Sequence, residues 1–137
     1  MEMDANKPVL LYAEDDVDDF ESLKDAVAQL TDKYTLLQAK NGTEVLSILE
    51  ERFTETHPCL IILDLNMPIM DGKEVLIWLK NDQRYKNIPV MVFTTSSRED
   101  DLRLCQSHKC TFFRKPTLYR DLLHIAQMML DMCDGKE

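Results

Sequence analysis

The 137-residue chain has few basic residues, few glycines and no long apolar run, and each shortage excludes a class of function. Lys and Arg number 16 against 25 Asp and Glu, so the formal net charge is −9. This sign argues against nucleic acid, whose phosphates require a basic patch. Glycine occurs at positions 42, 72 and 135 alone, and no glycine-rich phosphate loop is present. No apolar run approaches the length that spans a membrane, and no lipid-anchor pattern occurs.

The four cysteines have irregular spacing, and no signal peptide precedes them. This usage predicts reduced thiols in a soluble, cytoplasmic protein. The stretch Cys105-x-x-His108-x-Cys110 raises a zinc hypothesis. Its spacing does not match a usual structural zinc motif, and no fourth ligand is evident. We interpret it as two small apolar thiols and a loop histidine.

Short apolar runs alternate with amphipathic segments along the whole chain. Strands are expected at residues 8–13, 34–39, 59–64, 88–93 and 110–114. Helices are expected at residues 17–30, after Thr43 as a cap, after Gly72, from Ser97 to about Ser107, and at residues 118–133. The fourth of these opens on Ser97-Arg-Glu-Asp, which has the form of a capping box.

Five strands alternating with five helices predict an α/β protein with a parallel sheet covered on both faces. We expect the flavodoxin-like doubly wound (βα)5 arrangement, with five strands in the order 2-1-3-4-5. The chain should form a single domain over residues 1–137, with its core at about residues 8–133. In this order strands 1 and 3 are neighbours, which places Glu14-Asp15 beside Asp64.

Polar residues follow four of the expected strands at the edge where reactive groups gather in such sheets. They are Glu14 and Asp15 after strand 1, Asp64 after strand 3, Thr94 after strand 4 and Lys115 after strand 5. Three converging carboxylates repel one another unless a cation lies among them, and their hard oxygens suit Mg²⁺. A lysine and a hydroxyl supply donors for phosphoryl oxygens, and a carboxylate can itself be the nucleophile. The residues therefore predict a Mg²⁺-dependent phosphoacceptor.

At these positions the chain resembles a two-component response regulator receiver domain. The resemblance rests on Glu14-Asp15, on Asp64-Leu-Asn-Met-Pro68 with Asp71-Gly72, on Thr94, and on Lys115-Pro116, and it extends from about Pro8 to Cys133. It implies that Asp64 accepts phosphate in a chain that catalyses its own phosphorylation and dephosphorylation and acts on no other substrate.

The resemblance also implies a role for each of the other residues. Asp15, Asp64 and the main-chain carbonyl of Asn66 would ligate Mg²⁺ (or Mn²⁺), with Glu14 acting through water. Lys115 would bind a phosphoryl oxygen, while Thr94 and the aromatic Phe112 would move toward the phosphate as switch residues. The peptide bond before Pro116 is expected to be cis.

The implied partners are a sensor histidine kinase or phosphotransfer protein and a downstream protein target, with neither nucleic acid nor membrane involved. We expect a stand-alone regulator because the chain ends after the fifth helix. Its output would come from the face of helix 4, strand 5 and helix 5, which could also form a homodimer, or from passing phosphate on in a relay. His108 resembles the corresponding residue of some phytochrome-associated single-domain receivers.

Three alternatives stay open. The chain could be a receiver-like interaction module that is never phosphorylated, or a flavodoxin-like cofactor binder, against which the missing glycine-rich loop argues. It could also be a haloacid-dehalogenase-like phosphatase, although that class places Asp-x-Asp after its first strand. Asp16, Asp18 and Asp19 are interpreted as solvated acids at a helix start.

Overall fold

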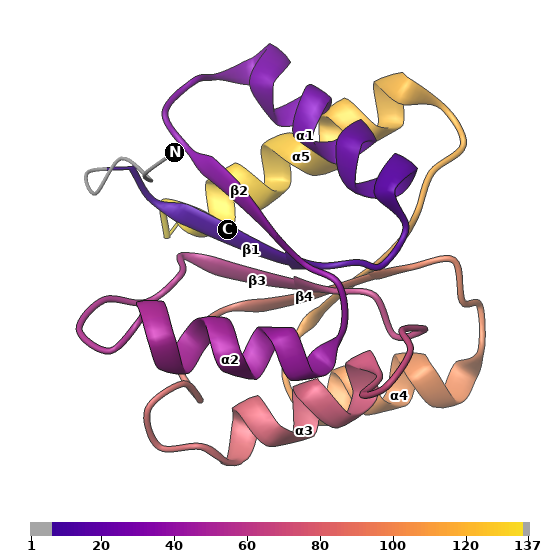
Figure 1. Ribbon diagram of the computed structural model, residues 1–137. Helices are drawn as coiled ribbons and strands as arrows, with labels where there is room; N and C mark the ends of the chain where they lie inside the picture. The colour runs from indigo at the N-terminus through magenta and orange to yellow at the C-terminus, as the bar shows by residue number, and fades with distance from the viewer. Residues whose placement is uncertain (1–6, 136–137) are drawn as a thin grey trace.

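The computed structural model describes residues 7–135, in which strands and helices alternate throughout (Figure 1). The strands are β1 (Val9–Ala13), β2 (Thr35–Ala39), β3 (Leu60–Leu63), β4 (Val90–Thr94) and β5 (Thr111–Arg114). The helices are α1 (Val17–Leu30), α2 (Gly42–Arg52), α3 (Gly72–Asn81), α4 (Glu99–Ser107) and α5 (Tyr119–Cys133). All ten expected elements are present, and their ends differ from the expected ones by a few residues at most. No helix in this part of the chain is long and apolar enough to cross a bilayer.

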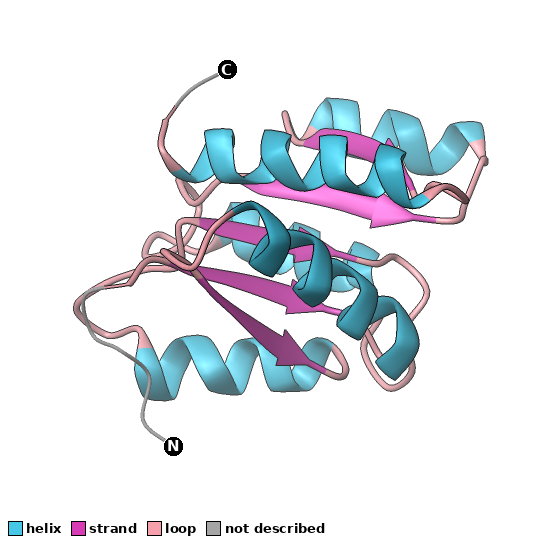
Figure 2. Ribbon diagram, turned by 90° about the horizontal axis from the view of Figure 1, so that it is seen from above, coloured by secondary structure: helices cyan, strands magenta, loops and turns pink. Residues whose placement is uncertain are grey.

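The five strands form one parallel sheet in the order β2-β1-β3-β4-β5, which confirms the expected topology. Helices α1 and α5 cover one face, and α2, α3 and α4 cover the other (Figures 1 and 2). Because successive strand residues point to opposite faces, β1 contributes Leu10 and Tyr12 to the α1/α5 core and Leu11 and Ala13 to the other. All five residues of β1 are buried, as expected for a central strand covered on both sides.

Backbone hydrogen bonds continue past the strand ends and fix the residues that follow. The amide of Glu14 donates to the carbonyl of Ala39 at 2.9 Å, and the amide of Asp64 donates to the carbonyl of Ala13 at 3.1 Å. The amide of Lys115 likewise donates to the carbonyl of Thr94 at 2.8 Å. These residues therefore occupy positions set by the sheet itself, even though they belong to loops.

Two expected helix caps are wrong. Asn41, not Thr43, is the cap of α2, and its side chain accepts the amide of Glu44 at 2.9 Å. The capping box expected at Ser97 is absent, since α4 begins at Glu99 with no side-chain cap.

A polar contact near the start of α4 takes the place of that box. The hydroxyl of Ser96 donates to Asp101 at 2.5 Å and accepts the amide of Arg98, and Lys73 of α3 pairs with the same Asp101 carboxylate at 3.1 Å. Asp101 is buried, so these contacts satisfy a carboxylate that would otherwise be costly to bury.

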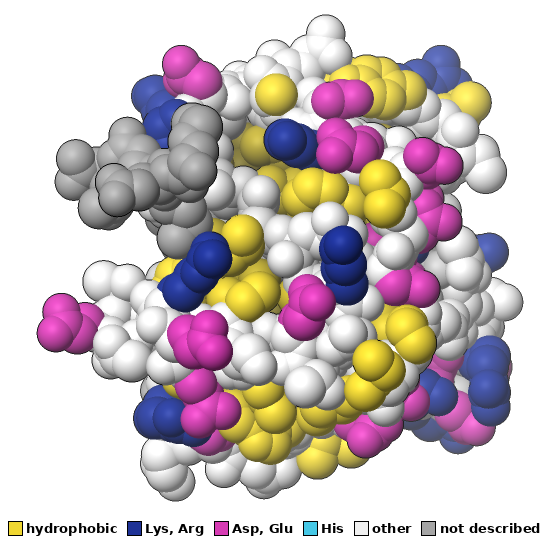
Figure 3. All heavy atoms as spheres, viewed as in Figure 1, with side chains coloured by type: hydrophobic (Ala, Val, Ile, Leu, Met, Phe, Trp, Pro, Cys, Tyr) yellow, Lys and Arg dark blue, Asp and Glu magenta, His cyan; other side chains and the backbone are white. Residues whose placement is uncertain are grey.

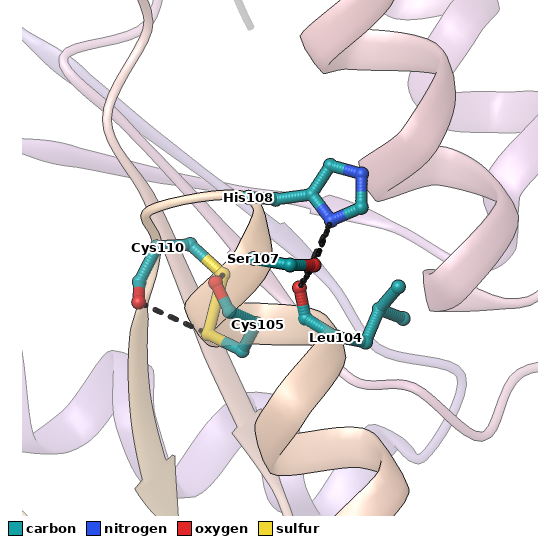
Figure 4. The surroundings of a disulfide bond; sticks show 5 residues. All are labelled: Leu104, Cys105, Ser107, His108 and Cys110. Carbon is teal, nitrogen blue, oxygen red and sulfur yellow. Dashed lines mark hydrogen bonds between the residues drawn. A yellow bond between two sulfur atoms is a disulfide. The ribbon is translucent and has the colours of Figure 1, made fainter.

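The expectation of reduced thiols is wrong for this structure, because all four cysteines are paired. Cys59, just before β3, bonds to Cys133 at the end of α5. Cys105 of α4 bonds to Cys110, just before β5 (Figure 4). Sequence spacing did not reveal either proximity. The cytoplasmic location inferred from free thiols therefore loses that support and stays a prediction.

The same region excludes the zinc hypothesis. The Cys105 and Cys110 sulfurs bond to each other, and the Nδ1 of His108 hydrogen-bonds to the Leu104 carbonyl at 2.9 Å, away from both sulfurs (Figure 4).

The loop between β3 and α3 is held in a tight conformation. Ile69 has a φ of 70°, and the amide of Met70 donates to the carbonyl of Pro68 across it at 2.8 Å, which is the pattern of a rare three-residue turn. The amide of Gly42 in turn donates to the Met70 carbonyl at 2.9 Å. Every peptide bond among residues 7–135 is trans, so the cis bond expected before Pro116 is not present.

We predict that Gly72→Ala destabilises the fold by about 3 kcal/mol, because overpacking beside rigid backbone is costly. A Cβ at this position would lie 2.1 Å from the Asp64 carbonyl oxygen and 2.8 Å from the Asp64 carbonyl carbon. Urea unfolding monitored by circular dichroism measures the loss. Gly135→Ala is the control, since it meets no atom within 4 Å and its φ of 77° costs about 1 kcal/mol or more. Equal losses in the two variants would contradict the steric explanation.

The two disulfides should contribute unequally to stability. Cys59 and Cys133 are 74 residues apart, against 5 for Cys105 and Cys110. Cross-linking the longer loop restricts the unfolded chain more, so Cys59→Ala should lower the free energy of unfolding of the oxidised protein by about 2–5 kcal/mol. Chemical denaturation with and without reductant tests this. The Cys59→Ala variant should lose most of the wild type's sensitivity to reductant, and Cys110→Ala should retain it.

Candidate functional site

The residues expected to form a site do converge at the carboxyl ends of the strands. Carboxylate oxygens of Glu14, Asp15 and Asp64 lie within 4.8 Å of one another. Hard oxygen donors at this spacing suit a divalent cation such as Mg²⁺, so the residues present fit the ion that the sequence predicted. Acidic side chains are visible along the right-hand edge of Figure 3, where the loops that follow the strands run.

Asp64 is buried and directly follows β3, a strand whose four residues are all buried. One carboxylate oxygen accepts the amide of Asn66 at 3.1 Å, and the other accepts the Lys115 ammonium at 3.0 Å. The carboxylate is therefore fixed on both oxygens, with a backbone donor on one side and a cation on the other. A buried carboxylate held in this way is oriented as a nucleophile would need to be.

Lys115 donates to three carboxylates at once. Its Nζ contacts Glu14, Asp19 at 2.8 Å and Asp64 at 3.0 Å. Burial by itself would lower the pKa of this ammonium, but the hydrogen bonds to Asp19 and Glu14 and the charge of Asp64 outweigh it and raise the pKa. Lys115 therefore stays charged and balances part of the acidic cluster.

Glu14 is almost fully buried, with 1% of its surface exposed. It accepts the hydroxyl of Tyr12 at 3.1 Å and the amide of Asp16 at 3.2 Å, in addition to the Lys115 ammonium. Burial raises its pKa to about 7, with the Asp64 charge adding to the rise and Lys115 opposing it. Burial also raises the pKa of the Tyr12 phenol, helped by Glu14, so that phenol remains a donor.

Thr94 adjoins the site through its carbonyl, which accepts the amide of Lys115, but its hydroxyl makes no hydrogen bond to Asp64. Thr94 is the last residue of β4 and is fully buried, and its hydroxyl accepts the amide of Ser96 at 3.2 Å. Phe112 of β5 lies opposite Val92 of β4. Its side chain is half-buried against the core on the α2/α3/α4 face. Their expected roles as switch residues stay predictions.

Sequence reasoning missed two members of the site. Asp19 was interpreted as a solvated acid, but it lies in the first turn of α1 and its carboxylate contacts Lys115. Its position three residues after the cap Asp16 was a usable signal once the start of α1 was known. Tyr12 was counted only as an apolar strand residue. Alternation along β1 could have placed it on the α1/α5 face, but not its hydroxyl on Glu14.

Comparison with known families and proteins gives a consistent result. A family model described as the response regulator receiver domain matches residues 10–127. The chain is 32% identical over 132 residues to response regulator Rcp1 of Synechocystis sp., covering 93% of this chain and 90% of that protein. It is also 32% identical over 84 residues to the polar-differentiation response regulator DivK of Brucella ovis, covering 61% and 65% of the two chains.

Solved structures agree. The phosphorylated cyanobacterial phytochrome response regulator RcpA superposes with a TM-score of 0.84 at 28% identity, covering 94% of this chain and 95% of that one. The Mn²⁺-bound form of response regulator Rcp1 gives a TM-score of 0.80 at 30% identity, covering 90% and 92%.

The raised pKa of Glu14 predicts how the stability of the metal-free protein depends on pH. The folded protein holds a proton on Glu14 up to about pH 7, whereas the unfolded chain releases it near the ordinary value of 4.5. Between these values the folded state binds more protons, so the contribution of Glu14 to stability falls as pH rises and is level above about pH 7.

Urea unfolding at several pH values in the presence of a chelator measures this slope. Glu14→Gln cannot titrate, so subtracting its profile from that of the wild type isolates the contribution of this carboxyl. Parallel profiles over that window would show that Glu14 titrates alike in the folded and unfolded states.

Proposed function

The chain belongs to the response regulator receiver domain family, and we propose that Asp64 is its phosphoacceptor. The observation that carries this proposal is the position of the Asp64 carboxylate. It follows a buried strand, takes an ammonium on one oxygen and a backbone amide on the other, and belongs to a cluster of three carboxylates that fits a divalent cation.

In the proposed reaction an oxygen of Asp64 attacks the phosphorus of a phosphodonor. The new bond joins this oxygen to phosphorus, while the bond from phosphorus to the nitrogen of a phosphohistidine, or to the oxygen of an acyl phosphate, breaks and its electron pair leaves with the donor. Mg²⁺, or Mn²⁺ in its place, would be held by Glu14, Asp15, Asp64 and the main-chain carbonyl of Asn66, and supplies positive charge for the phosphoryl oxygens. Glu14 is buried, which favours a supporting role over direct exposure to the donor.

Two side chains complete the reaction at Asp64. Lys115 moves one of its N–H donors to a phosphoryl oxygen and neutralises the charge that phosphorylation adds, about −1.5 to −2. Thr94 must release the amide of Ser96 to turn its hydroxyl toward the phosphate. That movement vacates space beside β5 into which Phe112 turns, and so biases the α4, β5 and α5 face between two arrangements.

Receiver domains act with histidine kinases or phosphotransfer proteins and with downstream targets, and we propose both kinds of partner here. The likeness to Rcp1 and to the phytochrome response regulator RcpA supports a role downstream of a sensor kinase. Output would come from a protein contact or homodimer at the α4, β5 and α5 face, or from passing phosphate on in a relay. We propose that the chain carries no other enzymatic activity.

The test is intact mass after incubation with acetyl phosphate and Mg²⁺. We expect one phosphoryl group on the wild type, none on Asp64→Asn, and none on either protein in excess chelator. Asp25→Asn is the matched control, since it removes a carboxylate from an exposed position of α1 and should be labelled like the wild type.

Full labelling of Asp64→Asn would show that another residue accepts phosphate. An unlabelled wild type would be examined further with beryllofluoride, which mimics the phosphoryl group. Failure to bind it in the presence of Mg²⁺ would leave the chain as a receiver-like module that is never phosphorylated.

A further inference from the structure

Asp19 accepts a hydrogen bond from Lys115, the lysine that the proposed reaction needs for the phosphoryl group. An ammonium has three N–H donors, and those of Lys115 go to Glu14, Asp19 and Asp64. No donor is left for a phosphoryl oxygen arriving at Asp64. One of the three contacts must therefore break before Lys115 can bind the phosphoryl group.

The three carboxylates differ in how easily they can give up the ammonium. The side chains of Glu14 and Asp64 are 1% and 9% exposed, so losing Lys115 would leave a buried acid without its hydrogen-bond donor. The side chain of Asp19 is 45% exposed, and water can solvate it once the contact breaks. Asp19 is also outside the group of carboxylates that fits a cation, so a bound cation would not draw it away from Lys115.

We propose that Asp19 is a positioning residue that restrains Lys115 and thereby slows phosphate uptake by Asp64 from small anionic donors. This inference rests on the proposed function of the site. Two effects act in the same direction. Asp19 keeps the third donor of Lys115 occupied, and its partly exposed negative charge, next to the ammonium that also holds Asp64, repels an anionic phosphodonor.

The contact between Asp19 and Lys115 lies beside a cavity. Asp19 and Lys115 both line a cavity of about 260 Å³ between α1 and the segment leading into α5, with Tyr12 and Phe93 on the apolar side. Asp64 is not among the residues that line this cavity, and Lys115 connects the cavity to Asp64 through its 3.0 Å hydrogen bond. The ion pair also joins the first turn of α1 to the residue that follows β5, two segments 96 positions apart in the sequence.

The decisive variant is Asp19→Asn, with Asp18→Asn as its matched control. Asp18 is the adjacent acid of α1 and is exposed, and Lys115 donates to no carboxylate besides Glu14, Asp19 and Asp64 among the described residues. With Mg²⁺ and acetyl phosphate, the initial rate of phosphorylation followed by intact mass should rise about 3- to 10-fold in Asp19→Asn. This range corresponds to the roughly 1 kcal/mol that two charges contribute at about 4 Å in water. Asp18→Asn should stay within about 2-fold of the wild type, because its exposed charge is screened.

A second measurement does not depend on phosphorylation. The ¹⁵N NMR signal of the Lys115 side-chain ammonium in metal-free protein reports its hydrogen-bond partners, and its shift should change in Asp19→Asn and not in Asp18→Asn. Asp19→Glu, which keeps the carboxylate, should restore a slow rate. A purely structural role for Asp19 would lower the melting temperature of Asp19→Asn without accelerating uptake.

The outcomes separate this inference from the proposed function. A labelled wild type with the same initial rate in Asp19→Asn would overturn the restraint and leave Asp64 as the phosphoacceptor. Absence of labelling in both proteins, together with failure of the wild type to bind beryllofluoride in the presence of Mg²⁺, would overturn the two together. Acceleration by Asp18→Asn equal to that by Asp19→Asn would show that general charge, and not the contact with Lys115, sets the rate, and would also overturn the proposal.

Discussion

The contact of one ammonium with three carboxylates is the interaction on which the site of this protein depends. Glu14 and Asp19 lie on either side of the start of α1, Asp64 follows β3, and all three meet at Lys115 after β5. Burial raises the pKa of Glu14 and the Asp64 charge adds to the rise, while the Lys115 ammonium opposes it and so favours the charged form of this acid. Charge balance therefore explains why the acids can lie together, and why adding the charge of a phosphoryl group would redistribute their contacts.

The sheet supplies the positions that this balance requires. Hydrogen bonds from the amides of Glu14, Asp64 and Lys115 extend the strand pairing by one residue, so these three residues are attached directly to the central sheet. The residues that would have to move lie just beyond. The Thr94 hydroxyl is held by one amide hydrogen bond, and Phe112 is half-buried. Rigid placement of the acceptor and looser placement of its neighbours are both needed if phosphorylation is to change a surface without changing the fold.

Most of the fold could be predicted from the sequence because its signals are local. Apolar runs such as residues 59–63 mark buried strands, and the order 2-1-3-4-5 then places Glu14 beside Asp64. The errors arose where the outcome depends on competition or on distant neighbours. Asn41, and not Thr43, caps α2, and the hydroxyl of Ser96 donates to Asp101 where a capping box at Ser97 was expected. The pairing of Cys59 with Cys133 required knowing that the end of α5 reaches the start of β3. Predicting the contact between Asp19 and Lys115 required knowing which side of α1 Asp19 lies on.

The two disulfides cross-link one edge of the sheet and leave the opposite edge without a covalent cross-link among the described residues. Cys59 precedes β3 and Cys110 precedes β5, so both cross-links lie at the amino ends of the strands, while the acids and Lys115 lie at the carboxyl ends. Covalent reinforcement at one edge leaves the loops of the other unconstrained. The resistance of the chain to unfolding can therefore change with the oxidation state of its surroundings while the loops around Asp64 keep their freedom to rearrange.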